Sequence, residues 1–310
     1  MKHIYFIDPL EKLNTKKDST MLMALTSKSL GIESYFLFEE DFYIQNTSEV
    51  VFDCYEFSGE IKDDFYVKDL ILGEVKQIKI DQDCTIHMRI DPPYDSRYQR
   101  YLWMLNFLVE KGINVSNNPI GIMKHNEKLE AYKIDNGFES YVGASLSGAK
   151  KFVSKLTERG VEFLILKPLD LFQGIGVEKI HVDQLEDRFV KKAKEYQGPV
   201  VIQPFEAKVS DGEIRSIFYK SKELGTILKV PKAGEFLANI AQGASFHQVQ
   251  LSEKLVKDCE SVCQKLMEDG VDLVAFDILG DKISEVNVTC PGLLVEVSYA
   301  VGENLAKKLF

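Results

Sequence analysis

The 310-residue sequence has no apolar run approaching the roughly 18 residues that a membrane-spanning helix needs. Its first residues, MKHIYFIDPL, lack a small-residue cleavage site and predict a first strand rather than a signal peptide. Only five cysteines are present, scattered and odd in number, which favours reduced thiols over a disulfide framework. These features together predict a cytoplasmic protein.

Positive charge is also in short supply. The chain carries 38 basic and 48 acidic side chains, a formal net charge of -10. This balance argues against nucleic acid and against an anionic membrane surface as partners, so a small anionic ligand would need its own cluster of Lys and Arg. The sequence has no internal repeat, and its glycines fit neither the P-loop nor the dinucleotide-binding pattern. An apolar content of 45% is enough for a large core over two or three structural units.

Strand-like and helix-like segments alternate along the chain, which predicts α/β or α+β layering. The opening predicts a βαβ unit, with strands at 3–8 and 33–38 and a helix that begins at Asp18 or Ser19 and ends at Gly31. Residues 45–80 mix strand signals with acidic turns. Later segments predict a strand before Pro92, a helix capped by Ser96, helices over 147–159 and 252–269, and strands over 162–168, 213–220 and 223–230. An Asn-Asn-Pro turn near residue 120 predicts a boundary between two units.

The stretch DLVAFDILGDKISEVNVTC, residues 272–290, predicts a β-hairpin with a Gly-Asp pair in its turn. A two-residue loop would place Glu285 opposite an apolar residue, whereas a three-residue loop would pair Asp277 with Glu285. The three-residue loop sorts the side chains better, because Asp277, Glu285 and Asn287 then share one face. Two carboxylates and an amide oxygen suit Mg²⁺ that shares its shell with phosphates. The alternative is a polar, solvent-facing side of the hairpin.

A phosphate-binding set precedes this hairpin. Lys167 ends an apolar strand, and the loop after it contains Gly174 and Gly176, whose backbone N–H groups are able to cover phosphate oxygens. Lys128, Lys167 and Arg215 would supply the positive charge that an acidic protein needs to hold a nucleotide. Taken alone, the Gly-Ile-Gly motif is weak, and each cation is equally compatible with a solvated surface position.

The motifs HMRIDPPYD, NNPIGIMKHNEKLEAY, LILKPLD, SDGEIRSI, ANIAQGA and AFDILGDKISEVNVTCPG occur in this order along nearly the whole chain. In order and spacing the sequence resembles the prokaryotic glutathione synthetases, members of the ATP-grasp superfamily. The resemblance implies an α/β (α+β) fold, with an N-terminal parallel-sheet pre-ATP-grasp domain (1–121) and a two-lobed ATP-grasp domain (122–310). The lid lobe would cover about 122–200 and the C-terminal lobe about 201–310. It also implies a homo-oligomer with small-molecule partners.

The family resemblance further implies a ligase in which ATP phosphorylates a substrate carboxylate and an amine attacks the acyl phosphate. Lys128 and Lys167 would contact the ATP phosphates, loop 170–177 would close over them, and Arg215 would stabilise the developing charge. The other implied nucleotide positions are Gly174, Gly176, Gln203, Pro204, Phe205, Glu206 and Asp211. The implied substrate positions are Arg89, Asp91 and Asn239. Asp277, Glu285 and Asn287 would bind two Mg²⁺ ions, or Mn²⁺ in their place.

Several positions depart from the family pattern, and they cluster on the acceptor side. The departing residues are Leu171, Phe172 and Gln173 in the lid loop, Leu237 and Val295 in place of arginines, Ala244 in place of a glycine, and Cys290 in place of a serine. Loss of two guanidinium groups removes bidentate contacts to carboxylate or phosphate. Three hypotheses are compatible with the sequence: a glutathione synthetase-type ligase for γ-glutamylcysteine and glycine, an ATP-grasp ligase for a different amino acid or peptide pair, and a nucleotide-binding relative without catalysis.

Overall fold

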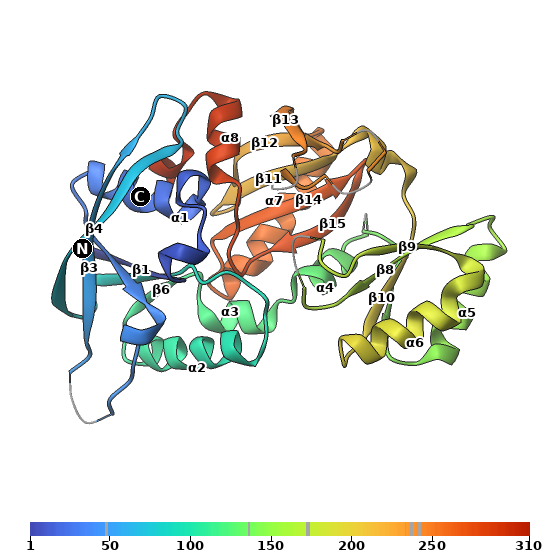
Figure 1. The fold of residues 1–310 in the computed structure, drawn as a ribbon, viewed down its shortest axis with the longest axis horizontal. Helices are drawn as coiled ribbons and strands as arrows, with labels where there is room; N and C mark the ends of the chain where they lie inside the picture. Colours follow the sequence, from blue (N-terminus) through green and yellow to red (C-terminus); the bar gives the residue numbers. More distant parts are fainter. Residues whose placement is uncertain (47–48, 136, 172–173, 233, 236–237, 241–242) are drawn as a thin grey trace.

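The computed structural model describes the chain except residues 47–48, 136, 172–173, 233, 236–237 and 241–242. Its strands form three sheets that succeed one another across the molecule (Figure 1). The mixed α/β class predicted from the sequence is confirmed. No helix in the described parts of the chain is both long and apolar enough to cross a bilayer.

The N-terminal sheet has the strand order β4-β3-β2-β1-β5-β6, with a parallel centre and an antiparallel edge. Its elements are β1 (Lys2–Ile7), α1 (Ser19–Ser29), β2 (Glu33–Phe38), β3 (Val51–Ile61), β4 (Val67–Lys79), β5 (Cys84–Met88), α2 (Ser96–Glu110) and β6 (Asn114–Ser116). Asp18 caps α1 by accepting from the N–H groups of Thr20 and Met21. The expected Ser96 cap of α2 is wrong. The cap is Asp95, one residue earlier, whose carboxylate accepts from the N–H of Tyr98.

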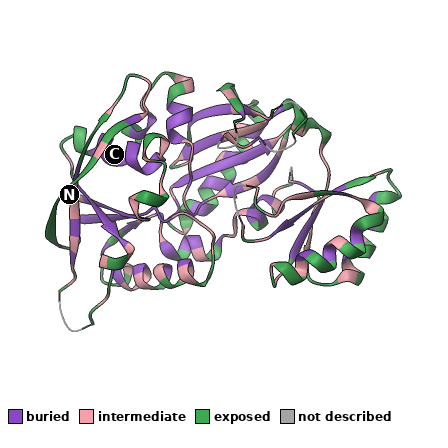
Figure 2. Cartoon of the chain, viewed as in Figure 1, coloured by how far each residue is buried: buried purple, intermediate pink, exposed green. Residues whose placement is uncertain are grey.

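The second sheet is antiparallel, in the order β7-β10-β8-β9, and carries two helices on one face. Its elements are β7 (Tyr141–Gly143), α5 (Leu146–Thr157), β8 (Phe163–Pro168), β9 (Glu178–His181), α6 (Leu185–Glu195) and β10 (Val200–Pro204), and α3 (Pro119–Lys124) and α4 (Glu127–Tyr132) lead into it. The outward faces of α5 and α6 are exposed (Figure 2). We call this unit the lid lobe.

The third sheet is antiparallel, in the order β13-β12-β11-β14-β15. Its elements are β11 (Glu213–Tyr219), β12 (Lys222–Val230), β13 (Ser245–Gln248), α7 (Glu253–Glu268), β14 (Leu273–Leu279), β15 (Lys282–Asn287) and α8 (Leu294–Val301). Cys259 and Leu266 of α7 pack in one buried cluster with Phe276 and Val286 of the hairpin. The opposite side of the hairpin is therefore left for polar side chains.

The hydrophobic cores show how the three units are joined. One buried cluster contains Met21 of α1 together with Ile227 of β12 and Val297 of α8, so the first and third sheets share a core. The lid lobe has a cluster of its own, which includes Leu166 and Phe189. The lid lobe is thus the unit that depends least on packing against its neighbours.

Candidate active site

A cavity of about 410 Å³ is lined by strand residues of the second and third sheets, by the start of α1, and by segments that connect the elements, among them the one after β5. Lys167 comes from the end of β8, Gln203 from β10, Arg215 from β11, and Asp277 and Glu285 from the β14–β15 hairpin. Almost every position expected to bind nucleotide, substrate or metal lines this cavity. The two exceptions are Gly176 and the exposed Asp211, which do not line it.

The hairpin pairs Asp277 with Glu285 and Ala275 with Asn287. The expected three-residue loop is wrong: Leu279 pairs with Lys282, so the turn has two residues, and a β-bulge at Ser284 shifts the register. The bulge allows Ile283 and Val286 both to face the core, which a regular strand would forbid. The polar pairing predicted from the sequence is therefore reached by another route.

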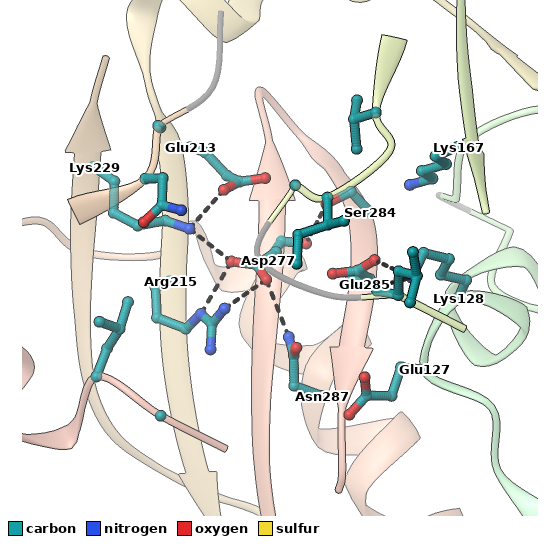
Figure 3. Close-up of a pocket in the computed structure, with 18 of the residues that line it drawn as sticks. Glu127, Lys128, Lys167, Glu213, Arg215, Lys229, Asp277, Ser284, Glu285 and Asn287 are labelled. Atoms are coloured by element: carbon teal, nitrogen blue, oxygen red, sulfur yellow. Dashed lines mark hydrogen bonds and ion pairs between the residues drawn. The ribbon is translucent and has the colours of Figure 1, made fainter. Parts of the chain in front are cut away.

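Asp277 is the centre of a buried charge network (Figure 3). Arg215 donates to both of its carboxylate oxygens, from Nε at 3.0 Å and from Nη2 at 2.7 Å. Lys229 Nζ lies 2.9 Å from Oδ1, and Asn287 Nδ2 lies 3.0 Å from Oδ2. Burial disfavours the charged form, but Arg215 and Lys229 outweigh it and hold the pKa of Asp277 well below its usual range. The aspartate is therefore ionised at neutral pH.

Lys229 and Glu213 belong to the same network, and the sequence reading did not identify them. Lys229 Nζ lies 2.5 Å from a carboxylate oxygen of Glu213, and the two residues face each other across β11 and β12. Burial raises the pKa of Glu213, and Lys229 offsets part of this rise. The available signal was the lysine inside the apolar run TILKV, since a charged residue in a buried strand needs a partner.

Glu285 faces the two lysines expected to bind phosphate. Its carboxylate lies 3.0 Å from Lys128 Nζ, which also donates to the Leu171 carbonyl at 2.7 Å. Burial acts against its ionised form, but Lys128 and Lys167 outweigh that effect and lower the pKa of Glu285. Lys167 lines the cavity at the end of β8 (Figure 3). Two cations and one carboxylate thus meet where β15 approaches the lid lobe.

Glu127, next to Lys128 on α4, was also missed. One of its oxygens accepts from the N–H groups of Val288 and Thr289 and from the Thr289 hydroxyl, at 2.8 to 3.0 Å. These bonds hold the turn that follows β15 against the start of α4. Burial raises the pKa of Glu127, whereas the three donated hydrogen bonds favour its charged form.

The segment Gln203–Glu206, expected among the nucleotide positions, lines the cavity from the end of β10, which belongs to the lid-lobe sheet and not to the C-terminal lobe (about 201–310) in which the expected bounds put it. Gln203 Nε2 donates to Ser140 Oγ at 2.8 Å, and the N–H of Phe205 donates to the Phe163 carbonyl at 2.9 Å. Lys179 Nζ lies 3.6 Å from the Phe205 ring centroid. Apolar side chains, among them Phe138, Ile165, Val209 and Leu279, also line the cavity. An apolar slot edged by backbone polar groups suits a planar base.

The lid loop approaches the cavity through Leu171, Gly174 and Ile175. Gly176 has a φ of 74°, and a Cβ there would lie 2.7 Å from the Tyr196 hydroxyl. Its carbonyl accepts from Lys192 Nζ at 2.7 Å. Gly176 therefore shapes the loop from outside the cavity, while Phe172 and Gln173 lie outside the described residues.

The remaining expected substrate positions also line the cavity, Arg89 and Asp91 from the segment after β5 and Asn239 from the loop between β12 and β13. Arg89 Nε donates to Thr20 Oγ1 at 2.9 Å, and its Nη2 donates to the Pro291 carbonyl at 3.0 Å. Of the positions that depart from the family pattern, Cys290 lines the cavity. Val295 is fully buried in the shared core and Ala244 does not line the cavity, while Leu237 lies outside the described residues.

Asp277, Glu285 and Asn287 offer the oxygen ligands that Mg²⁺ prefers, on one face of the hairpin. Within the described residues, no cluster of three or more His, Cys, Asp or Glu side chains is arranged to hold a metal, and this set contains only two carboxylates. Its chemistry fits an ion that takes its other ligands from phosphates and water. To bind the ion, Glu285 has to replace its contact with Lys128 by one with the metal. Asp277 likewise has to replace contacts with Arg215 and Lys229.

Comparison with known proteins gives matches over nearly the whole chain. The family model of the prokaryotic glutathione synthetase N-terminal domain matches residues 1–122, and that of the ATP-grasp domain matches residues 127–302. A glutathione synthetase of Prochlorococcus marinus subsp. pastoris is 26% identical, covering 100% of this chain and 97% of the relative. One of Ralstonia nicotianae is 27% identical, covering 99% and 93%.

Solved structures share the fold of this chain at low sequence identity. The D-cycloserine synthetase DcsG superposes with a TM-score of 0.68 at 11% identity, covering 99% of this chain and 98% of that one. The macrocyclase MdnC from Microcystis aeruginosa, bound to its precursor peptide, gives a TM-score of 0.62 at 11% identity, covering 99% of each. These likenesses establish the architecture of the chain.

Proposed function

The chain belongs to the prokaryotic glutathione synthetase family and is an ATP-grasp ligase that forms C–N bonds, and we propose that it joins γ-glutamylcysteine to glycine. One observation supports this most strongly. The β14–β15 hairpin presents Asp277 and Glu285 on the face that meets Lys128 and Lys167. Such an arrangement suits a nucleotide triphosphate next to a carboxylate substrate.

In the proposed reaction an oxygen of the substrate carboxylate attacks the γ-phosphoryl group of ATP, and ADP leaves with the bridging oxygen. The amine nitrogen of the second substrate then attacks the carbonyl carbon of the acyl phosphate. The tetrahedral intermediate collapses with loss of inorganic phosphate and of one proton from the nitrogen. No protein nucleophile is needed, since alignment, charge neutralisation and exclusion of water supply the rate.

The residues of the cavity divide this work. Lys128 and Lys167 neutralise phosphate charge, and the loop at Gly174 covers the phosphates. Arg215 binds the carboxylate oxygens and stabilises the oxyanion of the tetrahedral intermediate. Asp277, Glu285 and Asn287 would hold Mg²⁺, which when bound neutralises the phosphate oxygens. Before nucleotide and metal bind, the buried network around Asp277 holds the Arg215 guanidinium beside the cavity.

The test is an assay with ATP, Mg²⁺, γ-glutamylcysteine and glycine. We expect ADP, phosphate and tripeptide in equal amounts, with each substrate required. Binding of ATP without turnover would reject these substrates and leave the ligase class. Absence of ATP binding would reject the nucleotide site itself.

The second candidate function is ligation of a different amino acid or peptide pair, because Cys290 lines the cavity where the family pattern has a serine. A screen of amino acids and dipeptides for ADP release separates the two candidates. Release with γ-glutamylcysteine and glycine at least tenfold above every other pair would favour the first.

A further inference from the structure

The cavity is acidic at the end formed by α1, the segment after β5 and the start of α8. Three carboxylates line it there: Asp18, Asp91 and Glu296. We call this set the acidic end. Asp18 uses one oxygen to cap α1. Proximity of acidic side chains alone does not define a binding site, so the state of each carboxylate decides what the acidic end is for.

Glu296 carries the clearest sign that something is to be bound. Its side chain is 1% exposed, yet it lines the cavity from the first turn of α8. Its Oε2 atom is buried and accepts no hydrogen bond from any described residue. A buried carboxylate oxygen without a donor is costly, so a ligand that donates to it gains what the protein does not supply.

The cations near the acidic end do not satisfy it. Arg89 spends its Nε on Thr20 and its Nη2 on the Pro291 carbonyl. Burial raises the pKa of Glu296, and its own backbone N–H and the charge of Lys17 offset only part of this rise. Burial and the charge of Asp18 raise the pKa of Asp91, against lowering by a hydrogen bond from Cys290 and by Arg89. Burial also raises the pKa of Asp18, with Arg89 acting against it. A bound cation would therefore offset the repulsion among these three carboxylates.

The opposite polarity lies toward the hairpin. Arg215 and Glu296 line the same cavity, so the two side chains border one continuous space. A molecule that spans them would place an anionic group at Arg215 and a cationic group at Glu296. An amino acid or a peptide with a free amino group has this pair of charges.

We propose that the acidic end binds a protonated amine of the carboxylate substrate, with Glu296 as the main ligand, so that the enzyme selects acids that carry an ammonium group. This rests on the ligase function proposed above and specifies the class of its carboxylate substrate. The role of Glu296 is specificity: it binds the substrate away from the carbon that reacts. Asp18 and Asp91 strengthen the local negative potential around it.

The test compares γ-glutamylcysteine with glutarylcysteine, which differs only by lacking the amino group, at fixed ATP and glycine. For the unmodified protein we expect kcat/KM to be about 10- to 100-fold higher for the amino form, the value of a charge-assisted hydrogen bond. Glu296→Gln keeps the size of the side chain and removes its charge. It should shrink that preference by about tenfold or more, mainly through KM, with ATP binding unchanged.

The matched control is Glu253→Gln, the same chemical change at an exposed position of α7. It should leave the preference as it is. Equal use of the two peptides by the unmodified protein, or an unaltered preference in Glu296→Gln, would overturn the proposal. If the variant does not fold, the comparison on the unmodified protein decides alone.

A failure of the proposed substrates is distinguishable from a failure of this inference. If neither peptide supports ADP release although ATP binds, the substrates are wrong. The comparison then passes to any amino acids or peptides that do support ADP release, each against its form without the amino group. Preference for the amino forms supports the acidic end as an ammonium site, and preference for the other forms overturns it.

Discussion

Asp277 receives more charged contacts than its position in a strand would suggest. Two side-chain cations and one amide bind its two oxygens, and all of these groups are buried or nearly so. While such a network is complete, the attraction between its charges roughly offsets the cost of removing them from water. Removal of one partner leaves the remaining charges uncompensated. The network is therefore better understood as a device that holds Arg215 and Lys229 in position than as a source of net stability.

At the residue scale, we expect Asp277→Asn to lower the free energy of unfolding by about 3–5 kcal/mol at neutral pH, because Arg215 and Lys229 lose their counter-charge. The folded pKa of Asp277 lies below its unfolded value of 3.8, so the stabilisation is complete above that value and is lost as the pH falls below it. The difference in the free energy of unfolding between the unmodified protein and Asp277→Asn should therefore narrow below about pH 4. Denaturant unfolding at a series of pH values measures it, and a gap that is constant or widens on acidification would contradict the network.

The residues of this network show what a sequence reveals about a site. Asp277, Glu285 and Arg215 were identified because a family pattern and a hairpin register pointed to them. Lys229 and Glu213 were not identified, because their role depends on contacts between strands. Lys229, for example, contacts Asp277 from 48 positions away in the sequence. Glu296 was missed for the same reason, since its orphaned oxygen exists only once α8 is packed.

At the scale of elements, the lid loop depends on α6. Lys192 is buried in this helix and donates to the Gly176 carbonyl at 2.7 Å. We expect Lys192→Met to raise KM for ATP about 10- to 100-fold, the value of one hydrogen bond to a charged group, with a smaller effect on kcat. Steady-state kinetics with ATP as the varied substrate measure this.

The neighbouring Lys191 is exposed on the same helix and serves as the matched control. Lys191→Met should leave both constants within twofold of the unmodified protein. If Lys192→Met behaves in the same way, the bond to Gly176 does not order the loop for nucleotide binding.

The β14–β15 hairpin shows how a correct pairing was predicted through a wrong loop. Burial of Phe276, Ile278 and Val286 required Asp277 to face Glu285, and the sequence contained that requirement. It did not contain the choice between a longer turn and a bulge, because both solve the same packing problem. Backbone geometry at Gly280, with a φ of 63°, and the Ser284 hydroxyl bond to the Asp277 carbonyl accompany the bulge.

This geometry leads to a deletion experiment. Removing Ser284 leaves the two-residue turn and a regular strand in which Asp277 still faces Glu285, so we expect a folded protein that loses about 1 kcal/mol and remains active. Removing Val286 instead would turn Asn287 toward the core and should cost several kcal/mol. Thermal unfolding and ADP release compare the two. A Ser284 deletion as damaging as the Val286 deletion would show that the bulge itself is required.

At the scale of the whole molecule, the first and third sheets are locked together. They share a core, and Asn117 after β6 donates to the carbonyls of Leu273 and Val288 while accepting from the N–H of Leu273. The lid lobe has a separate core. Length and composition predicted two or three structural units, and the family resemblance implied a second domain with two lobes, but the unequal coupling of the units follows only from the packing.

We therefore expect amide hydrogens of β1 and β14 to exchange through one common opening, and those of β8 and β10 through an opening of lower free energy. ATP with Mg²⁺ should slow exchange in the lid lobe more than in the first sheet. Hydrogen exchange followed by mass spectrometry resolves the segments. A lid lobe that exchanges together with the other sheets would contradict a separately mobile unit.

The most direct measurement of the whole account is Mn²⁺ binding, followed by electron paramagnetic resonance, to the protein in the presence of ADP. The hairpin carboxylates should bind the ion together with the nucleotide phosphates, so Glu285→Gln should weaken Mn²⁺ binding at least tenfold while Glu253→Gln does not. Turnover should fall with it by orders of magnitude. Equal Mn²⁺ affinity in Glu285→Gln and the unmodified protein would contradict the claim that Asp277, Glu285 and Asn287 meet to carry a metal beneath a nucleotide.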